Sequence, residues 1–144
     1  MFRSGSLLMV SMVLLAGCFG RSGEIDLVNV TGQVLLEGKP LSDANVEFTP
    51  IDVMPNAKGL GGAGASASTN ADGEFDLYTA SQRGVQPGNY QVRISKFTEP
   101  VVNENAPMKP ARETVPAKYN TKSELTVEVV DSGLSDLTFE LDGK

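Results

Sequence analysis

This chain contains no histidine and no tryptophan, and it has a single cysteine, Cys18. Histidine is the commonest general base and the commonest metal ligand in proteins, so its absence argues against Ser-His-Asp or Cys-His catalysis and against ordinary zinc sites. With one cysteine, no disulfide can form within the chain. We therefore expect a protein that is not an enzyme and that holds no metal and no cofactor.

Basic residues are also scarce, with 12 Lys and Arg against 18 Asp and Glu in 144 residues, and the net charge is -6. The phosphates of nucleic acid and of anionic lipids would be repelled by such a surface, which argues against both as partners. The acids are spread along the chain, a pattern typical of a solvated surface. The length suits one domain.

The first 17 residues have the composition of a secretory signal. One basic residue, Arg3, precedes an apolar run from Leu7 to Leu15, and small residues follow it. This run is too short to cross a bilayer as a helix, which needs about 20 residues. The pattern therefore predicts a signal peptide over residues 1–17. Its removal takes away one base and no acid, so the net charge would change from -6 to -7.

The segment Leu15-Ala16-Gly17-Cys18 resembles the bacterial lipobox, in which cleavage precedes the cysteine and its thiol receives diacylglycerol. The resemblance implies two or three acyl chains on Cys18, enough to anchor a protein firmly to a membrane that it does not span. Residues 18–27 would form the lipidated, flexible tether. We expect a cell-envelope location facing away from the cytoplasm. In well-studied Gram-negative bacteria, an aspartate directly after the lipidated cysteine favours the inner membrane. Phe19 occupies that position here, so by analogy the outer membrane is favoured.

Beyond the tether, apolar and polar residues alternate with the period of a β-strand. Turn chemistry separates the segments, notably at Asp72-Gly73 and Pro87-Gly88. Residues 50–64, rich in glycine, and 98–118, with four prolines, are expected to be long loops. Residues 28–142 are therefore predicted to form an all-β domain, a seven-stranded antiparallel sandwich. The seven expected strands lie within residues 28–36, 44–48, 65–69, 75–79, 90–94, 125–129 and 137–141.

Three motifs resemble those of carboxypeptidase regulatory-like, or transthyretin-like, domains. They are G-Q-V with G-K-P-L and A-N-V-E-F within residues 32–48, T-N-A-D-G-E-F at 69–75, and P-G-N-Y-Q-V at 87–92. With the lipobox, the chain is similar to small lipoproteins abundant in planctomycete-like bacteria. The resemblance implies a prealbumin-like, Greek-key sandwich over roughly residues 28–141. The transthyretin-like hydrolases depend on histidines that this chain lacks, so their activity is not implied, and the fold alone names no function.

Two further patterns are weak. Residues 59–64 spell G-x-G-x-x-G, but no strand precedes them and no helical period follows, so we expect no nucleotide binding. The acids Asp72, Glu74 and Asp76 lack the spacing of an EF-hand, and turn chemistry explains them without calcium.

We therefore expect a non-catalytic envelope lipoprotein whose β-sandwich contacts an envelope protein or serves as a structural surface module. The long loops 50–64 and 98–118 would be the natural contact surfaces. The alternative is a carbohydrate-binding module for envelope polysaccharide. Its candidate contact residue is Tyr78, which falls on the outward phase of its predicted strand. An exposed tyrosine can also be there simply because it favours strands.

Overall fold

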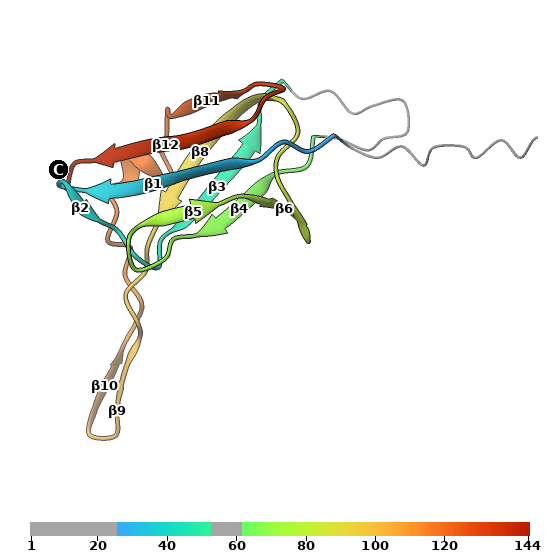
Figure 1. Ribbon diagram of the computed structural model, residues 1–144. Helices are drawn as coiled ribbons and strands as arrows, with labels where there is room; N and C mark the ends of the chain where they lie inside the picture. The colour runs from blue at the N-terminus through green and yellow to red at the C-terminus, as the bar shows by residue number, and fades with distance from the viewer. Residues whose placement is uncertain (1–25, 53–61) are drawn as a thin grey trace, which may run out of the picture.

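The computed structural model describes residues 26–52 and 62–144 (Figure 1). The predicted signal peptide (residues 1–17), its lipobox and Cys18 lie outside these ranges, as do most of the predicted tether and residues 53–61 of the glycine-rich segment. Within the two ranges, no helix has the length and apolar character needed to cross a membrane.

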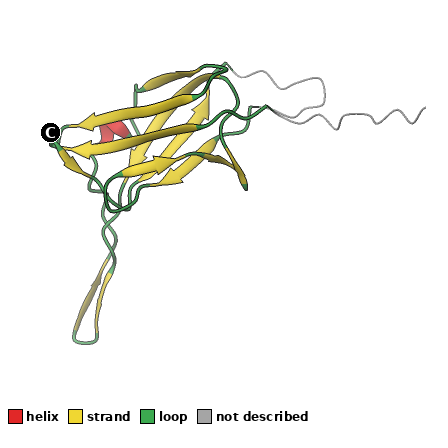
Figure 2. Ribbon diagram, viewed as in Figure 1, coloured by secondary structure: helices red, strands yellow, loops and turns green. Residues whose placement is uncertain are grey.

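The domain is all-β, which confirms the predicted fold class (Figure 2). Each of the seven predicted segments overlaps at least one strand. A short 3-10 helix, η1 (Ala117–Tyr119), interrupts the strands. The strands are β1 (Val30–Leu36), β2 (Lys39–Pro40), β3 (Asn45–Pro50), β4 (Ala65–Ser68), β5 (Glu74–Asp76), β6 (Tyr78–Thr79), β7 (Gln82–Arg83), β8 (Gly88–Ser95), β9 (Val101–Asn103), β10 (Ala106–Lys109), β11 (Thr126–Val129) and β12 (Leu134–Leu141).

Two sheets lie against each other (Figure 1). One has the order β12-β1-β2, with β5 also paired to β1, and the other has the order β11-β8-β3-β4-β6-β7. All pairs between these strands are antiparallel except β1 with β12, which run parallel. The prediction of a wholly antiparallel arrangement is wrong at this pair. A parallel pair needs a long connection, and here nearly the whole domain lies between the two strands.

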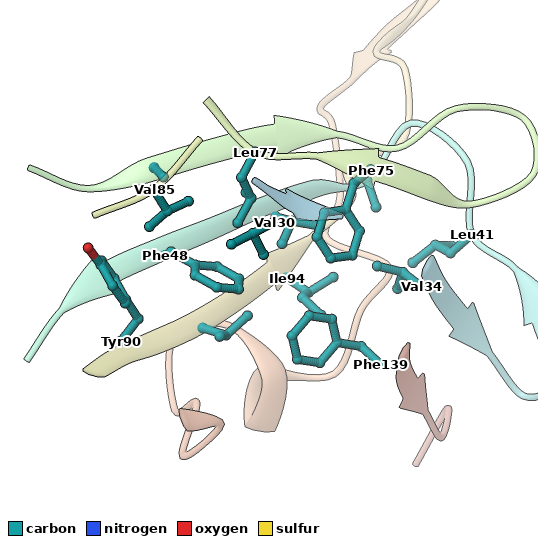
Figure 3. Packing of buried hydrophobic residues seen from close by; sticks show 14 of the residues in the cluster. Val30, Val34, Leu41, Phe48, Phe75, Leu77, Val85, Tyr90, Ile94 and Phe139 are labelled. Carbon is teal, nitrogen blue, oxygen red and sulfur yellow. The ribbon is translucent and has the colours of Figure 1, made fainter. Parts of the chain in front are cut away.

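The core fills the space between the sheets (Figure 3). Phe139 of β12 links the layers: its ring lies 6.4 Å from that of Phe48 in the opposite sheet and 6.0 Å from that of Phe75 in its own. The apolar alternation seen in the sequence therefore marks the inward faces, as expected for strands covered on one side. The buried apolar residues are Val30, Val34, Leu41, Ala44, Val46, Phe48, Ala65, Phe75, Leu77, Val85, Tyr90, Val92, Ile94, Val115, Val129, Phe139 and Leu141.

The segment predicted as one strand over residues 75–79 divides at Leu77. Its first part, β5, pairs with β1, and its second part, β6, pairs with β4 in the other sheet. Leu77 is fully buried between them, and its backbone N–H donates to the carbonyl of Val30 at 3.0 Å. The chain therefore crosses from one sheet to the other at this point and closes one side of the sandwich.

The predicted loop over residues 98–118 contains regular structure that the prediction missed. Strands β9 and β10 form a two-stranded antiparallel hairpin that projects away from the sandwich (Figure 1). Its base is held by backbone hydrogen bonds from Thr98 to Arg112 and from Thr114 to Lys96. The prolines suggested a loop, but Pro107 falls at an irregularity in the pairing, where a strand tolerates a residue without an N–H.

Candidate functional site

A hollow of about 620 Å³ lies on the outer surface beside the edge where β5 and β4 approach each other. Its volume is in the range of roughly 300–1,000 Å³ that is typical of ligand sites. Its walls come from both sheets, so only the folded domain brings them together. The lining residues are Thr31, Gly32, Gln33, Ala67, Ser68, Asn70, Glu74, Phe75, Asp76, Tyr78, Asp136 and Thr138.

Tyr78 lines both this hollow and a second one. The second hollow has a volume of about 430 Å³, and Tyr78 is the residue that the two linings share. The tyrosine side chain is 43% exposed, and its strand β6 pairs with β4 at Ser66. The structure thus places the sequence-predicted contact residue at a hollowed surface; that it contacts a ligand stays a prediction. The second hollow is lined by Asn45, Glu47, Gly64, Ala65, Ser66, Tyr78 and Ala80.

Asp76 is held at the wall of the larger hollow by one ion pair. Its Oδ2 lies 2.6 Å from Nε of Arg83, which reaches it from β7. Its other oxygen, Oδ1, is buried and accepts no hydrogen bond from the described residues. An unsatisfied buried oxygen costs stability, and in native structures it calls for an explanation.

Asp136 reaches the same hollow through a bulge in β12. The pairing of β1 with β12 shifts between Val30 and Gly32, so that β12 holds an extra residue at this point. Asp136 adopts a φ of 59°, a left-handed conformation that most residues avoid. Bulges are often found next to functional sites, where they redirect a side chain.

The turn that precedes β5 is organised by Asn70. Its Oδ1 accepts hydrogen bonds from the backbone N–H groups of Asp72 and Glu74, each at 2.9 Å, and its Nδ2 donates to a carboxylate oxygen of Glu74 at 3.1 Å. Gly73 has a φ of 72°, and a Cβ there would lie 2.5 Å from the carbonyl oxygen of Val34. Hairpin chemistry thus explains the predicted turn. Across the described ranges, no three His, Cys, Asp or Glu residues are grouped to hold a metal ion.

The two hollows are acidic. Glu47, Glu74, Asp76 and Asp136 contribute carboxylates to the linings, and neither lining contains a lysine or an arginine. The surface would therefore repel an anionic ligand and accept hydrogen bonds from a neutral one.

The β9–β10 hairpin is the second candidate surface. Phe97 at its base is 61% exposed, Val101 is 56% exposed, Val102 is 76% exposed and Met108 is 67% exposed. Sequence reasoning named the segment as a contact surface but missed its shape. The signal that could have revealed the strands, two adjacent valines in Val101-Val102, is short and lies between prolines.

Groups with shifted pKa values lie away from both surfaces. Burial raises the pKa of Tyr90, a core residue whose hydroxyl donates to the carbonyl of Gln86 at 2.7 Å. Near the C-terminus, the hydrogen bond between Lys118 and Asp142 raises the pKa of the lysine and lowers that of the carboxyl. Lys118 also lies over the ring of Tyr119, at 5.0 Å from its centroid. These contacts fasten η1 to the end of β12.

No protein-family model, no curated protein and no solved structure matches this chain. The resemblance to carboxypeptidase regulatory-like and transthyretin-like domains therefore remains a prediction from three sequence motifs.

Proposed function

We propose that this chain is a lipid-anchored, non-catalytic protein of the cell envelope whose β-domain binds another protein through the β9–β10 hairpin. The observation that carries the proposal is the exposure of apolar side chains on a hairpin that projects from the domain. Anchoring rests on the lipobox-like segment that ends at Cys18. The lack of histidine supports a non-catalytic role.

Exposed apolar side chains of the hairpin do not contribute the stabilisation that burial would give them. Val102 and Met108 are 76% and 67% exposed, although both would be stabilised by burial. Large apolar residues that cluster on a surface are typical of protein–protein contacts. The hairpin also carries Glu99, Glu104, Lys109 and Arg112, so its charges balance while the chain as a whole is acidic. A projection without an excess of basic residues is poorly suited to nucleic acid, and its exposed apolar residues suit a protein contact.

Site-specific photocrosslinking in intact envelopes would test the hairpin contact. A photoreactive residue at position 102 is expected to give a discrete adduct with one protein, because this side chain is the most exposed apolar group of the hairpin. The matched control is the same residue at position 130, since Val130 is an exposed apolar residue of the sandwich, 42% exposed. Identical adducts at the two positions, or none at 102, would contradict the proposal.

The anchor is tested separately by Cys18→Ser. We expect this substitution to abolish labelling of the protein by a clickable fatty acid and to release it from the membrane fraction, because the acylated thiol is lost. Acylation that persists in the variant would show that the lipobox interpretation is wrong.

Carbohydrate binding is the second candidate function, and one observation favours it. Tyr78, a ring with a polar hydroxyl, is exposed and lines two hollows that both contain hydroxyl and carboxylate side chains. Aromatic rings of this kind offer an apolar face to a ligand and a polar edge to water. The hairpin contributes no residue to either lining, so the two candidate functions use different surfaces.

A further inference from the structure

We propose that the two hollows form one groove for a segment of uncharged polysaccharide, with one sugar ring stacked on Tyr78. This inference rests on the second candidate function and gives it a site and a ligand class. The groove is defined as the linings of the two hollows, which share Tyr78.

The position of Tyr78 supports a ligand that extends to both sides of the ring. The larger hollow is bounded by β1, β5 and β12 of one sheet, whereas the smaller is bounded by β3 of the other. Strand β4 runs along both: Ser66 lines the smaller hollow and Ser68 the larger. A chain of sugar units that crosses Tyr78 would meet hydroxyl groups on either side. A single small molecule would leave one of the two hollows unused.

The lining chemistry suits sugar hydroxyls. Hydroxyl and amide side chains, among them Thr31, Gln33 and Thr138, can both donate and accept hydrogen bonds. Gln33 is held in place, because its Nε2 donates to the backbone carbonyl of Asp72 at 2.8 Å. The carboxylates are acceptors, and hydrogen bonds to a charged group are stronger than neutral ones. These hydroxyl, amide and carboxylate groups suit a ligand that is rich in hydrogen-bond donors.

Charge determines which sugars fit. Asp76 is paired with Arg83, whereas the other three carboxylates of the linings form no ion pair with a described residue, so a uronic-acid or sulfated polysaccharide would be repelled. A neutral polysaccharide carries no such penalty. The ligand class is therefore uncharged.

Several residues of this groove have an energetically unfavourable local arrangement. Asp76 Oδ1 is buried without a donor among the described residues, and Asp136 and Ala80 both have positive φ values, 59° and 53°. Each departs from the locally optimal arrangement, and such departures are common at functional sites. Of the four described residues other than glycine that have positive φ, two line the groove, and the other two, Glu37 and Asp43, lie outside it.

Affinity gel electrophoresis of the full chain in neutral detergent would test the proposal. The gels would contain galactomannan, mixed-linkage β-glucan or dextran as neutral probes, and polygalacturonate as the anionic comparison. Tyr78→Ala removes the stacking ring, and Tyr78→Phe keeps it. Phe97→Ala is the matched control, since Phe97 is an exposed aromatic residue, 61% exposed, that lines neither hollow.

We expect at least one neutral polysaccharide to retard the chain, and Tyr78→Ala to weaken the binding about tenfold or more. The affinities of Tyr78→Phe and Phe97→Ala should lie within about twofold of that of the unmodified chain, because both variants keep an aromatic ring at position 78. Retardation by none of the neutral probes, by polygalacturonate alone, or equally in Tyr78→Ala would overturn the proposal. The photocrosslink at position 102 should persist in Tyr78→Ala, so failure of either proposal can be told from failure of the other.

Discussion

The sandwich and the β9–β10 hairpin are both built from strands with apolar residues, and they differ in what covers those residues. In the sandwich, Val34 and Phe48 are fully buried between two sheets, whereas in the hairpin Val102 is 76% exposed. A two-stranded hairpin without a covering layer is marginally stable in water. Strand pairing therefore shapes both regions, while burial stabilises only the sandwich. The exposed apolar groups of the other remain free to bind a partner.

The largest expected effect is the loss of a core ring. Phe48→Ala should lower the free energy of unfolding by about 3–5 kcal/mol, because it leaves a cavity against the rings of Tyr90 and Phe139. Phe97→Ala at the base of the hairpin should cost less than about 0.5 kcal/mol. Urea denaturation followed by tyrosine fluorescence would measure both. Similar losses in the two variants would show that the hairpin base is packed as tightly as the core.

Loss of the buried hydroxyl of Thr69 should give the next largest decrease in the free energy of unfolding. Thr69 is 4% exposed; its Oγ1 accepts from the backbone N–H of Ala44 at 2.9 Å and donates to the carbonyl of Leu41 at 2.6 Å. Thr69→Val should cost about 1–3 kcal/mol, since both backbone groups lose a buried partner. The same change at exposed Thr126 should be nearly neutral, and equal costs at the two sites would contradict this account.

Alkaline pH should weaken the sandwich through Tyr90. Burial raises the pKa of this phenol above its ordinary value of 10.0, so the folded state holds its proton more tightly than the unfolded state. The stabilisation is complete below pH 10.0 and is lost as the pH rises through the folded-state pKa. When unfolding free energies are measured between about pH 8 and 11, Tyr90 should leave them unchanged below about pH 10 and should make them fall with pH above that value, less steeply in Tyr90→Phe. Equal slopes in the two proteins would show that Tyr90 is not the group responsible.

The smallest expected effect on stability is in the hairpin. Replacing Val102 and Met108 together by serine should change the free energy of unfolding by less than about 0.5 kcal/mol, because neither side chain is buried. The same variant should lose its partner in pull-down experiments from solubilised envelopes. A loss of more than about 1 kcal/mol would show that the hairpin contributes to folding, and the contrast with the sandwich would disappear.

The strand pattern of the sandwich was predictable because one face of each strand is covered. The alternation at Val92 and Ile94 of β8, for example, identifies residues that point inward. The hairpin was missed because its strands have no covered face, and its prolines resemble those of a loop. The division of residues 75–79 was missed for a different reason: alternation continues through Leu77 while the chain changes sheets.

The candidate groove was predictable only in part. The outward phase of Tyr78 follows from the inward positions of Phe75 and Leu77, and the side chain is indeed exposed. The hollows beside it required strands from distant parts of the sequence. Asp136 reaches the groove from β12, 58 positions beyond Tyr78, through a bulge that has no clear signature in the sequence.

Alternation and turn chemistry act between near neighbours, so the all-β class, the hairpin turn at Asp72-Gly73 and most of the inward-facing residues could be predicted from the sequence alone. The sequence also contains the lipobox-like segment that predicts the anchor at Cys18. The folded structure was needed to show that β1 pairs in parallel with β12, that β9 and β10 project from the domain, and that Tyr78 lines two hollows. Which distant strands pair depends on how the whole core packs, so it cannot be predicted from local sequence patterns.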